Sequence, residues 1–327
     1  MTIDDIAGAL GVSKTTVSRA ISGNGRIGAE TRERVLEYIR CHNYRPNLVA
    51  KGLAKQRTYN IAVVWPGDYT SFDLPFFQRL LIGINSYLSE RDYDIIIAVD
   101  VGNDYTSLKR IVDNRKCDGV ILTRTLKRDK TIAYLQQEGI PFVTVGSCND
   151  ASVTQIDNDN RGACCELTQI LLAKGYKRLV LIGGPSDQVV NEQRYEGFTD
   201  AYIRAGASPE EGLAYMDVVD DMHLHTVLSD IIKRHVDGIV CMDDYLAAQT
   251  LIKCHTDEIR IPEDIKLASF YDSSALRNSV PSITSIRFDD HALGEEAAKA
   301  ILQKLDGCVP RNEKLRQYNV VLRESTQ

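Results

Sequence analysis

The sequence predicts a small all-α head joined to a two-lobed α/β body with one parallel sheet in each lobe. Residues 2–23 contain two short helical patterns separated by a glycine. From residue 60 onward, strand-like apolar runs alternate with helical patterns, and the series occurs twice. Up to Thr58 there are ten Lys or Arg against five Asp or Glu, a balance of +5, and the total of −6 leaves −11 for the remainder. A basic head on an acidic body indicates contact with nucleic acid at one end only.

The first two helices of the head have recognisable ends. Thr2 can cap a helix that Gly11 ends, and Ser13 can cap a second helix that ends near Gly23. Two short helices joined by a glycine-containing turn form a helix-turn-helix, whose second helix can enter the DNA major groove. The alternative is a small helical bundle with an ordinary solvated face. The outward positions that can donate to bases and phosphates are Lys14, Thr15, Thr16, Ser18 and Arg19.

A third helix and a linker follow. Residues 30–41 place apolar side chains at helical spacing, with acidic residues early and Arg40 late, as the helix dipole prefers. Residues 44–58 contain little that forms a core, although Pro46 suits the first turn of a helix.

These motifs resemble one family. The stretch IDDIAGALGVSKTTVSRAISG, followed by ETRERVLEYI and NYRPNLVAKGLA, is similar to the head of the lactose/galactose repressor (LacI/GalR) family of bacterial transcription regulators. The likeness runs through the chain to the terminal Leu322–Ser325.

The resemblance implies a DNA-binding domain at residues 1–45 and a hinge helix at residues 46–58. In the family this helix orders on operator DNA when two subunits meet in the minor groove, and a side chain matching Leu53 wedges into a base step. Gly52 weakens such a helix by about 1 kcal/mol relative to Ala, and the alternative is a flexible linker. The expected DNA contacts are Ser13, Lys14, Thr15, Thr16, Ser18, Arg19, Asn24, Arg45, Asn47, Ala50 and Leu53.

The body consists of two similar series. Strand-like runs at residues 61–65, 94–99, 119–122 and 142–145 recur about 118 to 124 residues later, at residues 179–183, 213–218, 238–241 and 266–270. Such alternation predicts parallel sheets covered on both faces. The resemblance implies a periplasmic-binding-protein-like body with three crossings between lobes, near residues 157, 288 and 320. The expected N-terminal lobe is residues 59–157 and 289–320, and the C-terminal lobe is residues 158–288 and 321–327.

A ligand site is expected at the carboxyl ends of the strands, where parallel sheets bind their ligands. Aromatic faces, carboxylates and an arginine fork suit a sugar, and Arg194 and Asp244 match regular effector positions of the family. Phe76 can equally be core packing, and Asp243 can be only a helix cap. The predicted effector contacts are Asp68, Tyr69, Phe72, Phe76, Asp100, Thr123, Arg124, Arg194, Asp244, Tyr271 and Asp272.

Two departures from the family affect the ligand. Tyr271 replaces a usual acid, and residues 217–223 lack the aromatic that many members place near the sugar. A sugar is the leading effector. A nucleobase or a phosphosugar is the alternative, since Arg124 suits a phosphate.

The sequence lacks signatures of enzymes. No GxGxxG follows a strand, and neither a GxxxxGK loop nor a GxSxG elbow is present, so we expect neither catalysis nor a cofactor. The eight cysteines have no CxxC spacing and favour reduced core thiols. His223 and His225 are possible metal ligands on a strand, but we expect no metal site.

The expected compartment is the cytoplasm. No apolar run approaches the ~20 residues of a membrane span, and Asp4 and Asp5 stand where a signal peptide has basic residues. A solute-binding protein without a DNA role would need export, so the basic head favours a regulator.

The resemblance implies a homodimer on a near-palindromic operator. Release of a carbohydrate operon by a sugar is the default mechanism. Corepression, including corepression through a phosphocarrier protein partner, is the alternative.

Overall fold

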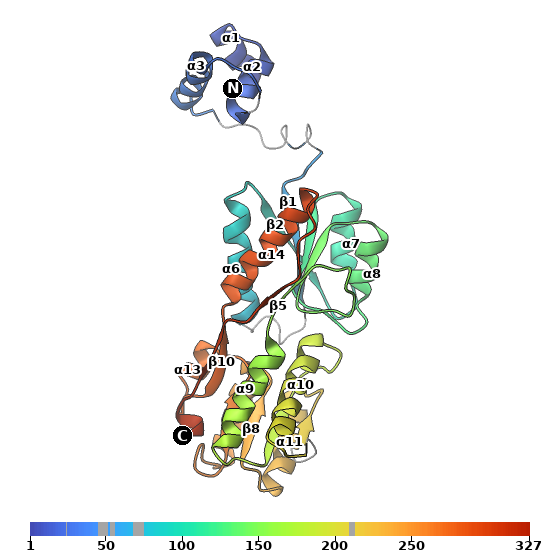
Figure 1. Ribbon diagram of the computed structural model, residues 1–327, viewed down its shortest axis with the longest axis vertical. Coiled ribbons are helices and arrows are strands. Elements are labelled where there is room, and N and C mark those ends of the chain that lie inside the picture. Colours follow the sequence, from blue (N-terminus) through green and yellow to red (C-terminus); the bar gives the residue numbers. More distant parts are fainter. Residues whose placement is uncertain (24, 45–51, 53–55, 68–74, 209–212) are drawn as a thin grey trace. The chain divides into compact units, whose positions relative to one another are not determined.

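The computed structural model describes residues 1–23, 25–44, 52, 56–67, 75–208 and 213–327. The chain divides into two compact units, residues Met1–Thr58 and Tyr59–Gln327. Figure 1 labels α1, α2 and α3 in the first unit and shows two sheet-containing lobes in the second.

The head consists of α1 (Ile3–Leu10), α2 (Lys14–Ser22) and α3 (Ala29–Cys41). Thr2 and Asp5 form a reciprocal capping box at the start of α1, and Ser13 Oγ accepts the Thr16 amide at the start of α2. Gly11 and Gly23 end these helices in the left-handed conformation that glycine adopts without strain. The predicted helix-turn-helix is therefore confirmed. The apolar core of the head joins Ile6, Ala7, Val17, Ala20 and Val35 from all three helices.

The first lobe contains a six-stranded sheet with the order β11-β5-β4-β3-β1-β2, in which every pair is parallel. Helices α6 and α14 cover one face and α7 and α8 the other. The elements are β1 (Asn60–Pro66), α6 (Pro75–Ser89), β2 (Asp94–Asp100), α7 (Thr106–Asp113), β3 (Gly119–Leu122), α8 (Lys130–Gln137), β4 (Phe142–Val145), β5 (Gln155–Asn158), α14 (Asp290–Leu305) and β11 (Glu313–Leu315).

Two glycines let α6 and α14 pack closely. A Cβ at Gly83 would lie 2.1 Å from the carbonyl oxygen of His291, and one at Gly294 would lie 2.3 Å from that of Leu80. Any larger residue would push the helices apart, so these positions fix the separation of α6 and α14.

The second lobe repeats the layout with the order β12-β10-β9-β8-β6-β7, and only β10 and β12 pair antiparallel. Helices α11 and α12 cover one face and α9 and α10 the other. The elements are α9 (Asn160–Ala173), β6 (Leu179–Ile182), α10 (Val189–Arg204), β7 (Leu213–Tyr215), α11 (Asp221–Lys233), β8 (Gly238–Cys241), α12 (Asp244–Thr256), β9 (Lys266–Ser269), α13 (Ser274–Arg277), β10 (Thr284–Phe288), β12 (Tyr318–Val321) and the 3-10 turn η2 (Glu324–Thr326).

The chain passes between the lobes after β5, after β10 and between β11 and β12. The last passage differs from the predicted boundary at residue 320. The segment at residues 315–322 belongs to two strands, because Leu315 still pairs with β5 while Tyr318 pairs with Phe288 of β10. The predicted strand at residues 213–218 is also shorter, since β7 ends at Tyr215.

A buried carboxylate fastens the C-terminal segment to the second lobe. Asp272 Oδ1 accepts Arg323 Nη1 at 2.9 Å, and Oδ2 accepts Arg277 Nη1 at 3.1 Å and Arg287 Nε at 3.2 Å. Burial alone would raise the pKa of Asp272, but the bonds from Arg323 and Ser285 hold it below its usual value. The ion cluster therefore contributes stability at neutral pH that is lost as the pH falls below the usual aspartate value.

We expect Asp272→Ala to destabilise the protein by about 3–5 kcal/mol, because three guanidinium groups lose a shared buried partner. Urea unfolding followed by circular dichroism measures the change. Asp264→Ala, which removes the partner of exposed Arg260, is the matched control and should leave the midpoint nearly unchanged. Equal midpoints for the two variants would contradict the structural role of Asp272.

Candidate functional site

A cavity of about 720 Å³ lies between the two sheets of the body. Residues that follow or end strands of both lobes line it, including Thr123 after β3, Asp244 after β8 and Tyr271 after β9. This is the predicted place for a ligand, and the volume is typical of a small-molecule site.

The structure brings together the following predicted effector residues, all of which line the cavity: Phe76, Thr123, Arg124, Arg194, Asp244 and Tyr271. The predicted residues Asp68, Tyr69 and Phe72 lie outside the described part of the chain.

Asp244 is a buried carboxylate at the start of α12. Its side chain lines the cavity, and Oδ1 has no hydrogen-bond partner within the described residues. Burial raises the pKa of Asp244 to about 6, with a smaller contribution from the negative charge of Asp243. Arg194 Nε is likewise buried without a partner in the described structure. Buried polar atoms normally have partners, and both residues line the cavity, so these unpaired atoms mark it as a candidate ligand site.

The preceding residue, Asp243, has a different role. Its carboxylate accepts the Leu246 amide at 2.8 Å and caps α12, which is the alternative that the sequence offered for it.

Tyr271 is held from the opposite lobe. Its hydroxyl donates to Asp290 Oδ2 at 2.6 Å and accepts from Arg79 Nη2 at 2.6 Å. Arg79 Nε also donates to Asp290 Oδ2 at 3.0 Å, and burial raises the pKa of Asp290 to about 6. The tyrosine therefore contributes its ring to the cavity, where Phe76 meets it edge-on at 6.1 Å between centroids. No local pattern in the sequence indicates Arg79 and Asp290 as partners, because they are 211 residues apart.

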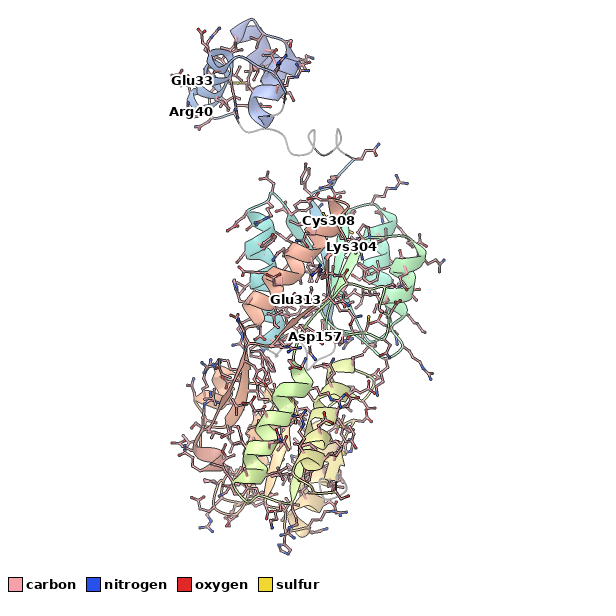
Figure 2. The ribbon with its side chains drawn as sticks, viewed as in Figure 1. Glu33, Arg40, Asp157, Lys304, Cys308 and Glu313 are labelled. Carbon is pink, nitrogen blue, oxygen red and sulfur yellow. The ribbon has the colours of Figure 1, made fainter. Side chains whose placement is uncertain are left out.

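Asp157 lies where the chain first leaves the N-terminal lobe, as Figure 2 shows. Its Oδ2 accepts Ser147 Oγ at 2.6 Å in the first lobe and Gln193 Nε2 at 3.3 Å in the second. Burial raises the pKa of Asp157 despite these bonds. Sequence reasoning missed this lining residue as a contact because it placed a domain boundary there.

Two predicted effector residues do not line the cavity. Asp100 accepts the amides of Ser107 and Leu108 at 2.9 and 3.2 Å and thereby holds the start of α7. Asp272 is enclosed by the arginine cluster described above. Asp100 ends a strand and Asp272 follows one, as ligand residues would, but nearby donors of the chain occupy both carboxylates.

The head presents one polar face of α2. Lys14, Thr15, Ser18 and Arg19 are exposed, whereas Val17 and Ala20 are in the core. The hydroxyls of Ser13 and Thr16 lie 2.8 Å apart at the helix start. The predicted DNA contacts Asn24, Arg45, Asn47, Ala50 and Leu53 lie outside the described residues.

Two basic side chains of α2 have contacts within the head. Lys14 Nζ lies 2.5 Å from Asp4 Oδ1 of α1, and both side chains are mostly exposed. The aliphatic part of Arg19 lies over Gly25, where a Cβ would come within 3.1 Å of Arg19 Cδ. Lys14 must leave Asp4 to reach a phosphate or a base.

The two histidines considered as metal ligands are not on a strand. His223 and His225 lie in α11, and His223 donates its amide to Asp220 at the helix cap. Among the residues that the structure describes, no group of three or more His, Cys, Asp or Glu is arranged to hold a metal ion. All eight cysteines are free. The same described residues contain no helix both long and apolar enough to span a lipid bilayer.

Comparison with known proteins gives matches to both parts of the chain. Residues 2–47 match the model of "Bacterial regulatory proteins, lacI family", and residues 168–326 match the model of the "Periplasmic binding protein-like domain". The chain is 28% identical over 314 residues to the HTH-type transcriptional regulator CelR of Thermobifida fusca, covering 94% of this chain and 92% of that protein.

Solved structures give the same result. A transcriptional regulator CelR–cellobiose complex has a TM-score of 0.74 at 26% identity and covers 99% of both chains. A lac repressor dimer bound to operator and the anti-inducer ONPF has a TM-score of 0.80 at 22% identity, covers 100% of this chain and 99% of that one, and shows the same fold.

The helix-turn-helix head and the two-lobed body with its cavity define a ligand-responsive, DNA-binding transcriptional regulator. The chain belongs to the lacI family of bacterial regulatory proteins. The relatives CelR of Thermobifida fusca and MalR of Staphylococcus xylosus are HTH-type transcriptional regulators.

We expect Asp244→Asn to stabilise the protein without ligand by about 2 kcal/mol at pH 7.5. The raised pKa of Asp244 means that ionising it costs free energy in the folded state only. The protonated carboxyl of Asp244 stabilises the folded protein. This stabilisation is complete below the usual aspartate pKa and is lost as the pH rises through about 6. The difference between variant and parent should therefore disappear near pH 4.

Urea unfolding at both pH values measures this difference. Exposed Glu90→Gln is the control for loss of one carboxylate. A destabilised Asp244→Asn at pH 7.5 would show instead that the carboxylate is well paired.

Proposed function

We propose that this protein is a homodimeric repressor of a carbohydrate operon, that α2 of each subunit reads operator DNA, and that a sugar in the cavity releases it. The observation that carries the ligand part is that one cavity is lined by Asp244 and Arg194, which have a buried unpaired acceptor and donor, and by Phe76 and Tyr271. The CelR–cellobiose complex supports a sugar by analogy. Action on operator DNA implies the cytoplasm, and no catalytic step is part of the proposal.

The DNA-binding part rests on the exposed polar face of α2. Lys14 and Thr15 are proposed to set base preference, because they lie at the N-terminal end of the recognition helix. Arg19, one turn later, is proposed to anchor a base edge or phosphate. The hinge residues 46–58 are proposed to order on DNA.

The dimer is supported by exposed apolar surface. Strand β2 is the edge of the first sheet and exposes Ile97 and Val99, and α6 beside it exposes Ile82. In the second lobe Met222 is 82% and Val280 79% exposed. Apolar side chains of this size on an open edge indicate a covered surface, and a two-fold dimer matches a near-palindromic operator. A phosphocarrier corepressor is not needed for this arrangement.

Closure of the cavity is supported by contacts between the lobes. Lys127 donates its amide to the Asp187 carbonyl at 2.8 Å, and Val189 donates its amide to the Thr125 carbonyl at 3.2 Å. Lys127 Nζ also lies 2.9 Å from Glu192 Oε1. These contacts join the end of β3 in one lobe to the start of α10 in the other. A ligand that stabilises this closed arrangement shifts the angle between lobes and hence the DNA-bound population.

We expect Arg19→Ala to weaken operator binding by about 1–3 kcal/mol while leaving the unfolding of the body unchanged, because the side chain is exposed on α2. Fluorescence anisotropy with operator fragments from the protein's own genomic neighbourhood measures the affinity. Exposed Arg91→Ala in the body is the charge-matched control. Unchanged affinity for Arg19→Ala would remove α2 as the recognition helix.

We expect Lys127→Ala to weaken sugar binding about two- to fivefold, as loss of a half-exposed ion pair predicts. Operator affinity without sugar should stay the same or rise slightly, because the closed arrangement that the pair stabilises is the one that releases DNA. Calorimetric titration measures sugar affinity. Lys109→Ala removes a similar pair within α7 and serves as the control. A sugar affinity equal to that of the control would contradict a closing role for Lys127.

A further inference from the structure

We infer that the cavity selects an uncharged polyhydroxylated ligand and rejects its phosphorylated and carboxylated forms. This inference rests on the proposed sugar-receptor function and narrows the class of its ligand. It decides between the neutral sugar and the phosphosugar that the sequence left open.

The described lining of the cavity is strongly acidic. It contains two guanidinium groups, those of Arg124 and Arg194, against six carboxylates. These carboxylates are Asp157, Asp187, Asp220, Asp221, Asp243 and Asp244. An anionic ligand would enter a space of its own sign, and the low dielectric of a closed cavity strengthens that repulsion.

The helix N-termini at the cavity, which would otherwise attract anions, are already occupied. Asp220 accepts the His223 amide at 2.7 Å at the start of α11, and Asp243 accepts the Leu246 amide at 2.8 Å at the start of α12. At the start of α10 the Val189 amide is bound by the Thr125 carbonyl. At each of these helix starts, one of the protein's own oxygens thus takes an amide that a phosphate would use.

Hydroxyl groups can pair with the unpaired polar atoms of the lining. Asp244 Oδ1 and Asn158 Oδ1 are buried acceptors and Arg194 Nε is a buried donor, and none has a partner among the described residues. A hydroxyl both donates and accepts, so the hydroxyls of a polyol can pair with all three atoms. A phosphate group has only acceptor oxygens and cannot pair with the two buried acceptors.

The aromatic side of the cavity fits the same ligand. Phe76, Tyr271 and Phe288 line it, and the Tyr271 hydroxyl is engaged by Arg79 and Asp290. Only ring surface is therefore offered there, which suits the C–H face of a sugar ring and gives no donor to an anion.

Trp65 provides a reporter for the test. It is the sole tryptophan of the chain, and its ring lies 5.6 Å from that of Phe77, which lines the cavity. Titrations of the full chain, followed by Trp65 fluorescence and thermal shift, would compare glucose, ribose, maltose and cellobiose with glucose 6-phosphate, glucuronate, ribose 5-phosphate and the 6′-phosphates of both disaccharides.

We expect at least one neutral sugar to bind and its anionic form to bind more than tenfold more weakly. Asp244→Asn keeps the shape but removes one negative charge, so it should reduce this discrimination severalfold, while exposed Glu90→Gln should not. Binding of an anionic form as tight as that of its neutral parent would overturn the inference and leave a sugar receptor standing. Failure of every saccharide, with binding of hypoxanthine or guanine instead, would overturn the proposed function and the inference together.

Discussion

The functional arrangement depends on one constraint, which is that parallel strands end at a common edge. Each lobe has its strand ends at the cavity, and the loops and helix starts that follow supply nearly all of its polar groups. The same geometry places the starts of α10, α11 and α12 at the cavity. Their positive ends must be balanced, and Asp220 and Asp243 do so from within the chain.

Because those caps are internal, the remaining polar groups are free to recognise a ligand. Asp244 directly follows the capping residue Asp243 and does not itself cap α12. Its burial lowers the stability of the folded protein, which is the usual relation between a prepared site and the scaffold that holds it. The rings of Phe76 and Tyr271 then provide the apolar counterpart.

Much of this could be predicted from sequence, because local patterns determine it. The caps at Thr2 and Ser13 and the short apolar runs of the strands are signals within a few residues. The identity of the ligand contacts was less predictable. An aspartate at the carboxyl end of a strand can line a ligand cavity, as Asp244 does, or hold a neighbouring helix, as Asp100 does. The local sequence pattern does not distinguish the two cases. Only the tertiary structure decides which donors are near.

Contacts between residues far apart in the sequence could not be predicted, for a related reason. Tyr271 was predicted at the cavity, but Arg79 and Asp290 come from helices that meet only because Gly83 and Gly294 allow close packing. Likewise, residues 313–321 divide into β11 and β12 because β11 pairs with β5 and β12 pairs with β10.

That split has a consequence for biosynthesis. Strand β11 completes the first sheet and β12 the second, and Ser325 Oγ then donates to the Leu267 carbonyl of β9. Neither lobe has its full set of strands until these last segments have emerged from the ribosome. Because the lobes share one closing segment, they must acquire their final form nearly together. A nascent chain stalled before residue 313 carries two additional open sheet edges, at β5 and β10, that invite association with other chains.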